Sequence, residues 1–282
     1  MKQTTTFLFL CFVAIAAIAQ QKADIEVGYM AHHPNLRNGK DDLTSQYILL
    51  ANADGSKFFS PKTEYVDSLN STPNGKAKLN EMKRNAYLGG KLDDIPRSDG
   101  SYYVVKSSTA NKYIYYDNSG LEKYMYEEQI AKLGWEITDS TKNVLGYECI
   151  MATVDYHGRR WTAWFSPGIP MNAGPWKLAG LPGLILEATA DGNQYSFAAT
   201  GIQQVDKPIT PIYLANEYEK TDRLKFLRAR RSFLDNPLGK INAQFAGSGV
   251  SVSKVRNEDG SDATGSIFAP VSVVDLIETD YH

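Results

Sequence analysis

Residues 147–166, YECIMATVDYHGRRWTAWFS, consist of two runs that favour β-strands, joined by a dipeptide that suits a tight turn. The dipeptide His157-Gly158 stands between the runs, as a two-residue hairpin turn requires. Because side chains alternate between the faces of a strand, one face of this hairpin is apolar and the other is mixed. The stretch therefore predicts an antiparallel hairpin whose apolar face joins a core. The predicted facing pairs are Tyr156 with Arg159, Asp155 with Arg160, Val154 with Trp161, Ala152 with Ala163, and Ile150 with Phe165.

A second hairpin is predicted in residues 184–202, where Asp191-Gly192 is typical of a type I′ turn. The apolar segment 174–183 lies between the two hairpins and is expected to cover one end of the core. Within it, Pro182-Gly183 suits the centre of a type II turn, with positive φ at the glycine. The second hairpin is expected to place the following residues opposite one another: Leu184 and Ala199, Leu186 and Phe197, Ala188 and Tyr195.

The rest of the chain predicts further strands and two helices. Leu79, Met82 and Ala86 share one helical face and indicate an early helix. A later helix is expected to begin at Thr221, which can cap it, and to end before Pro237. We therefore expect a β-rich α+β fold, in which a curved antiparallel sheet carries an early helix and a C-terminal amphipathic helix. The other predicted strands are residues 24–30, 43–50, 56–60, 102–106, 112–117 and 135–139.

The composition is that of an ordinary folded protein, with 43% hydrophobic and 22% charged residues in 282. The 30 Lys and Arg residues nearly balance the 32 Asp and Glu residues, giving a net charge of −2. Nucleic-acid-binding proteins usually carry a basic excess, so no nucleic-acid partner is expected. The sequence contains none of the common motifs for a nucleophilic serine, a zinc site, a phosphate-binding loop or a dinucleotide-binding fold. We therefore have no reason to expect a cofactor or a metal.

Residues 1–19 have the features of a signal peptide: Lys2, an uncharged apolar run at residues 7–18, and the small residues Ala17 and Ala19. We expect cleavage after Ala19 and export to the periplasm or the medium. The apolar run is too short for a transmembrane span, which needs about 20 residues. The expected regions are a signal peptide at 1–19, a β-rich domain at 20–210, an amphipathic helical segment at 211–236, a flexible linker or long loop at 237–266, and a short apolar segment at 267–282.

The segment Gly180-Leu181-Pro182-Gly183-Leu184-Ile185 resembles the signature of the GLPGLI family of exported Bacteroidota envelope proteins. This resemblance implies export and a β-rich fold, but no established activity. At the level of architecture, the succession of strands is also similar to LolA-type periplasmic lipoprotein carriers, which implies a half-barrel over an apolar cavity. The flanking motifs that resemble the GLPGLI family are residues 145–149, 160–167, 169–170 and 174–176.

Cys149, Asp155 and His157 are the residue types of a cysteine-based catalytic triad. An extended strand, however, separates the thiol from the imidazole by about 26 Å. A packed thiol is therefore expected, and no catalytic residue is assigned. His32-His33 is not expected to hold a metal, because neighbouring side chains on a strand point to opposite faces. Glu127-Glu128 is predicted to be the solvated turn of a short helix.

The helix after Thr221 carries five basic residues, and we expect its leucines to pack on the sheet while these charges lie in water. A helix of this kind can also bind an anionic membrane surface. The basic residues are Arg223, Lys225, Arg228, Arg230 and Arg231.

The mixed face of the first hairpin is the expected ligand-binding surface, formed by Met151, Arg160 and Trp164, with Trp176 folded over it as a lip. The alternative is that the early helix, through its apolar face, covers this surface and leaves no cavity. We accordingly expect an exported, non-enzymatic envelope protein that binds an apolar or lipid-like ligand, or another envelope protein, on a curved sheet. Two alternatives remain open: an envelope hydrolase or redox enzyme that uses Cys149, and a purely structural interaction protein.

Overall fold

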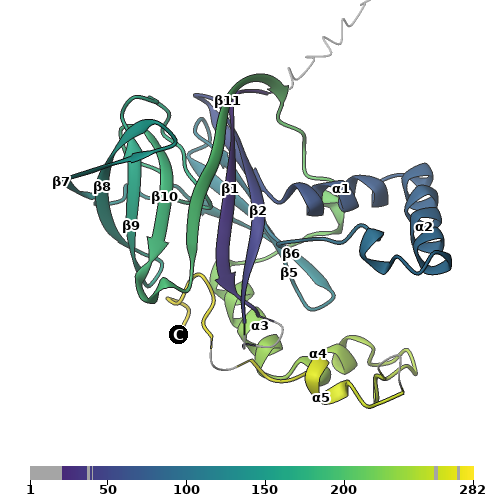
Figure 1. The fold of residues 1–282 in the computed structure, drawn as a ribbon. Coiled ribbons are helices and arrows are strands. Elements are labelled where there is room, and N and C mark those ends of the chain that lie inside the picture. The colour runs from purple at the N-terminus through teal and green to yellow at the C-terminus, as the bar shows by residue number, and fades with distance from the viewer. Residues whose placement is uncertain (1–20, 37–38, 40, 257–259, 272–273) are drawn as a thin grey trace, which may run out of the picture.

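The structure of this chain, a computed structural model, describes residues 21–36, 39, 41–256, 260–271 and 274–282. Its strands form one open, curved sheet (Figure 1). The strands are β1 (Lys22–Pro34), β2 (Asp42–Ala51), β3 (Gly55–Phe59), β4 (Tyr103–Ser107), β5 (Lys112–Ser119), β6 (Glu122–Gln129), β7 (Glu136–Val144), β8 (Tyr147–Tyr156), β9 (Arg159–Ser166), β10 (Leu184–Ala190), β11 (Ser196–Pro208) and β12 (Glu219–Lys220).

The order of strands across the sheet is β12-β6-β5-β4-β3-β2-β1-β11-β10-β9-β8-β7. Neighbouring strands from β2 to β6, and from β7 to β11, are consecutive in sequence, so that two meanders lie side by side. β1 joins them by pairing with β2 on one side and with β11 on the other. Only β12, which runs parallel to β6, departs from antiparallel pairing among the described strands. The predicted β-rich α+β class is confirmed, although the sheet is mixed and stays open.

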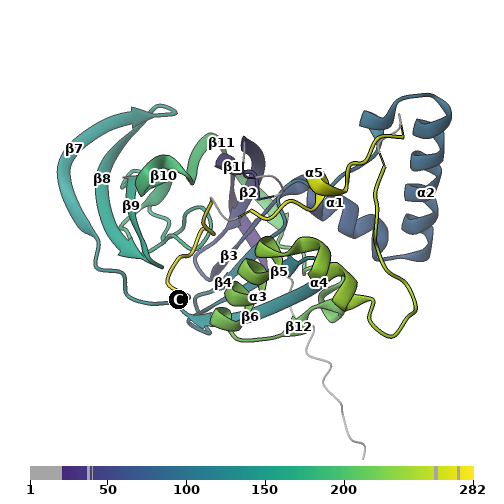
Figure 2. The same cartoon turned by 90° about the horizontal axis from the view of Figure 1, so that it is seen from below.

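The helices lie outside the sheet. α1 and α2, inserted between β3 and β4, project from one side of the sheet, whereas α3 packs against β5 and β6 (Figures 1 and 2). The predicted early helix is confirmed as α2, but α1 is an addition that begins at the cap Ser60, whose side chain accepts from the Thr63 amide. The cap of α3 is Asp222 rather than Thr221. The helices are α1 (Pro61–Asn70), α2 (Pro73–Leu88), α3 (Arg223–Asp235), α4 (Pro237–Gln244) and α5 (Thr264–Ile267).

The first predicted hairpin is confirmed in every facing pair. β8 and β9 pair from Ile150 with Phe165 to Tyr156 with Arg159, and Asp155 faces Arg160. The turn residues His157 and Gly158 have positive φ values of 53° and 80°, as a type I′ turn requires. The sequence therefore determines this register through its turn residues and its alternation.

The register predicted for the second hairpin is wrong by two residues, because Ala188 faces Phe197 rather than Tyr195. Gly192 and Asn193 both have positive φ, and they lengthen the connection between β10 and β11. A shift of two residues keeps each side chain on its predicted face, because side chains alternate with a period of two. Ala188 and Phe197 are buried, as expected.

The predicted type II turn at Pro182-Gly183 is also wrong. The positive φ values in this segment fall on Trp176 (53°) and Gly180 (100°), and Gly183 is not among the residues with positive φ. Gly183 is required for a different reason: a Cβ at this position would lie 2.1 Å from the carbonyl oxygen of Ser166. The glycine allows the chain to pass directly against β9.

Glu127 and Glu128 lie in strand β6, so their prediction as the turn of a short helix is wrong. Alternation along the strand separates the two carboxylates. Glu127 faces the outer side and pairs with Lys112 at 2.6 Å and Lys220 at 3.0 Å. Glu128 belongs to a largely buried group of charges on the concave side.

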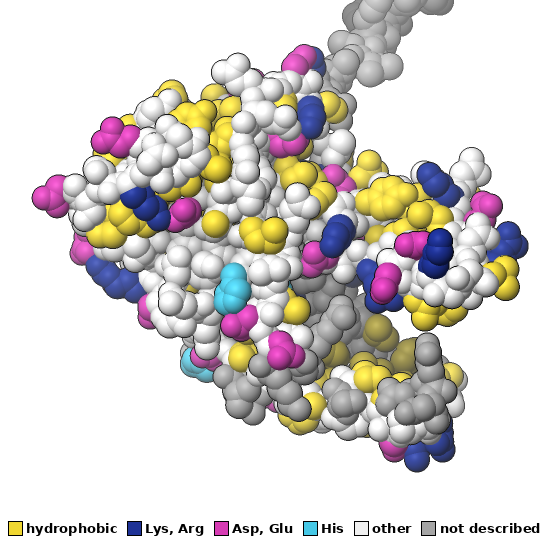
Figure 3. All heavy atoms as spheres, viewed as in Figure 1, with side chains coloured by type: hydrophobic (Ala, Val, Ile, Leu, Met, Phe, Trp, Pro, Cys, Tyr) yellow, Lys and Arg dark blue, Asp and Glu magenta, His cyan; other side chains and the backbone are white. Residues whose placement is uncertain are grey.

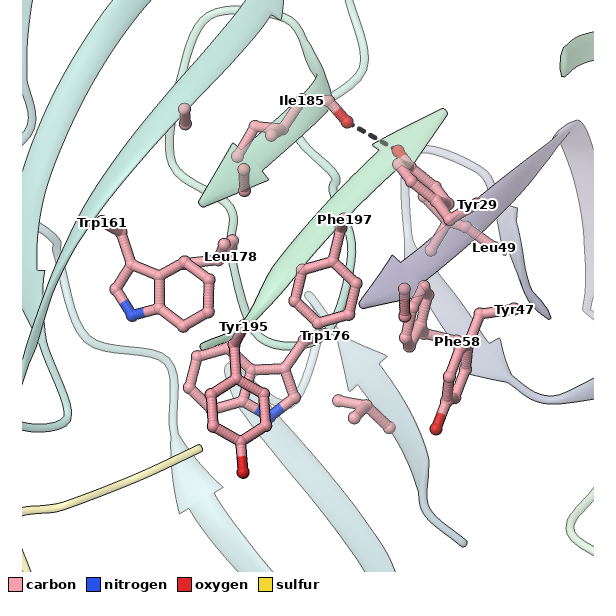
Figure 4. Close-up of a cluster of buried hydrophobic side chains, with 14 of the residues drawn as sticks. Tyr29, Tyr47, Leu49, Phe58, Trp161, Trp176, Leu178, Ile185, Tyr195 and Phe197 are labelled. Atoms are coloured by element: carbon pink, nitrogen blue, oxygen red, sulfur yellow. Dashed lines mark hydrogen bonds between the residues drawn. The ribbon is translucent and has the colours of Figure 1, made fainter. Parts of the chain in front are cut away.

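Aromatic side chains fill the concave side of the sheet (Figure 4). The ring centroids of Trp161 and Trp176 are 5.4 Å apart, and those of Trp161 and Phe197 are 6.2 Å apart. The hydroxyl of Tyr29 in β1 donates to the Ile185 carbonyl in β10 at 2.6 Å, the dashed contact in Figure 4. A smaller apolar cluster around Leu50, Phe59 and Tyr103 covers part of the opposite face.

Residues 237–266, predicted as a linker or long loop, contain α4 and most of α5 among their described residues. The predicted signal peptide at 1–19 lies outside the described residues. None of the described helices is long and apolar enough to cross a membrane. On the face shown in Figure 3, acidic and basic side chains are interspersed rather than gathered by sign.

Candidate functional site

A cavity of about 710 Å³ opens between the concave face of the sheet and helix α3. This volume lies within the usual range for small-molecule sites. Its walls come from the ends of β1 and β2, the segment before β4, the end of β5, and α3. The polar and aromatic residues of the lining include His33, Ser45, Tyr47, Asp99, Tyr102, Tyr115, Asp117 and Arg230.

Stacked tyrosines form one wall of the cavity. Tyr47 stacks on Tyr102 with centroids 5.0 Å apart, and Tyr102 stacks on Tyr115 at 5.6 Å. Burial raises the pKa values of all three phenols, which keeps them as neutral hydrogen-bonding groups. The wall therefore offers flat apolar rings with hydroxyls attached to them.

A buried ion pair forms the base of the cavity. The Asp117 side chain is 2% exposed and accepts from Arg230 Nη1 at 2.6 Å. Asp117 also accepts from the Tyr115 hydroxyl at 3.2 Å, and Arg230 donates to the Asn118 carbonyl at 2.8 Å. Burial lowers the pKa of Arg230, but the Asp117 charge and further contacts raise it above its usual value. The pair joins α3 to β5.

A serine between a histidine and an aspartate lies at the side of the cavity. Ser45 Oγ donates to Asp99 Oδ1 at 2.6 Å, and His33 Nε2 lies 3.0 Å from the same hydroxyl. His33 Nδ1 lies 3.1 Å from the Pro34 carbonyl, which can only accept, so the proton belongs on Nδ1. The single hydroxyl hydrogen of Ser45 then faces two acceptors unless His33 is protonated. Burial lowers the pKa of His33 and opposes that protonation.

A second group of charges contains the residues that come nearest to a metal-binding arrangement, His157, Glu278 and Asp280. Arg223 already donates to Glu278 at 2.6 Å and to Asp280 at 2.8 Å. Lys177 donates to Glu278 at 2.7 Å. These cations supply the positive charge that a metal would bring, so the group is an ion-pair network.

The four residues predicted to bind ligand do not lie on one surface. Trp164 and Met151 face each other on the outer side of the first hairpin, where Lys142 lies over the Trp164 ring at 4.4 Å. Arg160 lies on the same side and pairs with Asp155 and Glu136. Trp176 is buried in the concave core, because it packs on Trp161 from the other face of β9. The predicted lip over Trp164 is therefore wrong.

Cys149 is fully buried, and burial raises the pKa of its thiol, as the nearby Glu187 charge also does. A thiol nucleophile needs a lowered pKa and access, and Cys149 has neither. The structure thus removes the basis for an enzyme that uses this residue. His32 and His33 also separate: His32 reaches Asp42 at 3.3 Å, whereas His33 reaches Ser45.

The basic residues of α3 are paired more extensively than predicted. The leucine face packs on the sheet as expected, with Leu227 and Leu234 buried. The expectation that the charges lie in water is wrong for four of the five basic residues, since each of these donates to acidic or carbonyl groups of the chain. They are Arg223, Arg228, Arg230 and Arg231. The cationic face of α3 therefore contacts other segments of the same chain.

The cavity residues escaped the sequence analysis because they come from distant segments. One signal was available: Tyr113, Tyr115 and Asp117 share a face of β5, which places a carboxylate on an aromatic, core-facing row. A charge in that position needs a buried partner. The sequence alone does not identify Arg230 as that partner.

Comparison with known proteins finds one family model that matches part of the chain. The family model described as "N-glycanase peptide, N-terminal domain" matches residues 95–227, from the segment before β4 into α3. Two structures of PNGF-II match part of the chain. The P21 form has 17% identity and a TM-score of 0.48, covering 73% of this chain and 32% of that one. The C2 form has 15% identity and a TM-score of 0.49, covering 74% and 33%.

The chain thus spans about a third of the length of those structures. No curated protein matches its sequence. The expected likenesses to GLPGLI proteins and LolA-type carriers find no support in these matches, although the β-rich fold that both implied is confirmed. The predicted non-enzymatic protein for apolar or lipid-like ligands is contradicted, because the matching model describes part of an N-glycanase.

Proposed function

We propose that this chain takes part in the enzymatic processing of N-glycans, and that the 710 Å³ cavity receives carbohydrate of the substrate. The observation that carries the proposal is the combination of the family match with a cavity whose tyrosine wall lies beside charged groups. The matched residues 95–227 include the segment before β4, the end of β5 and the beginning of α3, which all line the cavity.

The chemistry of the cavity suits a sugar better than an apolar ligand. A pyranose ring carries apolar C–H groups. These can pack on the edges of the Tyr102 and Tyr115 rings, whose faces are already stacked on one another and on Tyr47 and Tyr126. Its hydroxyls need donors and acceptors, which Asp99 and Asn118 can supply from the cavity wall. A purely apolar ligand would offer these polar groups no hydrogen bond.

Binding of an N-glycosylated peptide, compared with the same peptide without its glycan, tests the proposal by calorimetry. We expect the mature protein to bind the glycosylated form more tightly. Ser98→Trp, at an exposed position in the cavity lining, should block the opening and abolish this difference. Equal binding of both peptides, or unchanged binding by this variant, would contradict the proposal.

A matched pair of tyrosine variants locates the effect. Tyr102→Phe removes a hydroxyl inside the cavity and is expected to weaken glycopeptide binding about 2- to 10-fold, the usual worth of one hydrogen bond. Tyr116→Phe removes a hydroxyl from the next strand outside the cavity lining and should leave binding unchanged. Equal losses in both variants would place the binding surface elsewhere.

Export remains part of the proposal. Residues 1–19 predict a protein that acts outside the cytoplasm. Mass spectrometry of the protein from its own cells should give an N-terminus at Gln20, and a chain that begins at Met1 would contradict export.

A further inference from the structure

A second, smaller cavity of about 170 Å³ lies at the other end of the concave face, between β4, β5 and the loop before β10. Lys106 at the end of β4 and Tyr113 at the start of β5 line it from the sheet. Asn172 and Gly180 line it from the loop that carries the GLPGLI segment. The Gly180 amide donates to Asn172 Oδ1 at 2.6 Å, which joins the two ends of this part of the loop.

Lys106 is a buried cation that has no carboxylate beside it. Lys106 is 9% exposed, and its ammonium donates to the Asn172 carbonyl at 2.5 Å. Among the described residues, no carboxylate oxygen lies within 4.0 Å of Lys106 Nζ. Burial lowers the pKa of this group, and no nearby acid compensates.

The other two lysines that are buried among the described residues each have a carboxylate partner, which Lys106 lacks. Lys57 pairs with Glu64, and Lys177 pairs with Glu128 and Glu278. Buried charges in folded proteins are as a rule paired. Lys106 departs from that pattern at the wall of a cavity, where a ligand can bring the missing charge.

The remaining lining selects the kind of anion. Ser108 and Asn111 offer neutral hydrogen-bonding groups, whereas Ile130 and Leu133 are apolar. Lys177 also lines the cavity, but its ammonium is already paired with Glu128 and Glu278. Lys106 therefore leaves one positive charge to balance, so a monoanion fits better than a phosphate dianion. The volume allows a carboxylate attached to a small body, such as one acidic sugar unit.

We propose that this cavity is a binding site for the carboxylate of a small acidic ligand, with Lys106 as its counter-ion. The site is separate from the 710 Å³ cavity and does not depend on the function proposed for it. The GLPGLI-bearing loop contributes to the site, because its Asn172 and Gly180 line the cavity.

The test uses glucuronate as the probe, with glucose as the uncharged match and inorganic phosphate as the dianion. NMR of isotope-labelled lysine side chains in the full mature protein should show the Lys106 signal shifting with glucuronate, and its pKa rising. Glucose should produce neither change, and phosphate should bind more weakly. A Lys106 signal that stays the same with glucuronate, or that responds equally to glucose, would overturn the proposal.

Variants separate binding from stability. Lys106→Met keeps the length of the side chain and removes the charge, so we expect glucuronate affinity to fall about 10- to 100-fold, the usual effect of losing a charged hydrogen-bonding partner. The melting temperature of this variant should not fall below that of the wild type, because a buried unpaired charge is removed. Addition of glucuronate should no longer raise the melting temperature of the variant. Lys240→Met, at an exposed position in α4, is the matched control and should bind like the wild type. Undiminished affinity in Lys106→Met would reject the site.

Discussion

Lys177 Nζ lies 2.7 Å from Glu278 Oε1, and both side chains are almost fully buried although 101 residues separate them. The contact joins the loop before β10 to the C-terminal segment. Glu128 accepts from the same ammonium at 2.6 Å, and Arg223 donates to Glu278 at 2.6 Å. Charges buried in this way depend on one another, because removal of one leaves its partner uncompensated in a medium that solvates charge poorly.

Lys177→Met is expected to lower the free energy of unfolding by about 3–5 kcal/mol, the usual cost of breaking a buried ion pair from one side. Urea unfolding followed by fluorescence measures the change. Lys207→Met is the matched control: Lys207 pairs with Glu26 but is 51% exposed, so a change below about 1 kcal/mol is expected. Similar losses in the two variants would show that the buried network contributes no more than a surface pair.

Glu128 should make the protein sensitive to acid. Burial raises the pKa of Glu128, but His157 and Lys177 lower it further, to about 2 from an ordinary value of 4.5. A carboxyl with a depressed pKa in the folded state gives stability that is complete above pH 4.5 and is lost as the pH falls towards 2. The contribution is on the order of 3 kcal/mol. Glu128→Gln should therefore flatten the pH dependence of unfolding in this window.

The control for that experiment is Glu148→Gln, an exposed glutamate of β8. It should keep the pH dependence of the wild type. If Glu128→Gln lost stability with falling pH as steeply as the control, the carboxylate would not be held by His157 and Lys177 as described.

Gly183→Ala is expected to destabilise the protein by about 1–3 kcal/mol, as overpacking usually does. The reason is the Ser166 carbonyl oxygen, 2.1 Å from where the new Cβ would lie. Gly201→Ala in β11 is the comparison, because no atom lies within 4 Å of its added Cβ and its φ is not positive. Thermal unfolding should show a clear loss for the first variant and none for the second; equal effects would speak against the close approach of the two segments.

The thiol of Cys149 should react slowly in the native protein. It is fully buried, and burial raises its pKa, so that little thiolate is present and reagents cannot reach it. Labelling with a thiol reagent, followed by mass spectrometry, is expected to proceed quickly only after unfolding in urea. Native labelling as fast as that of the unfolded chain would mean that the thiol is open to solvent.

Local sequence determined those parts of the fold that depend on neighbouring residues. The register of β8 and β9 follows from His157-Gly158 and the alternation around it, and all its facing pairs are confirmed. The second register failed because Asn193 joins Gly192 in adopting positive φ, which any Asn can do and a sequence does not reveal. Strand β6 was missed because its charged residues hide the alternation of its side chains. The inner side, including Tyr126, is buried by segments distant in sequence, among them α3, Lys177 and the C-terminal segment.

The candidate site could not be predicted in the same way. His33, Asp99 and Arg230 come from three separate parts of the chain, and only the folded sheet brings them to one cavity. The expected site on the first hairpin rested on aromatic residues, but Trp164 and Trp176 were separated by the sheet itself. Periodicity assigns a residue to a face; it does not show what the facing segment contributes.

The pairing of β1 with β11 has a consequence for the way the sheet forms. Lys22 faces Pro208, so this pairing joins segments that are nearly 190 residues apart, whereas each meander needs only neighbouring segments. Contacts over such distances slow folding, because the chain loses much entropy before the contact forms. The two meanders are therefore expected to form early and independently, with β1 attached to β2. The step that limits the rate is then the docking of β11 against β1, and during synthesis it must wait until the ribosome has released residue 208.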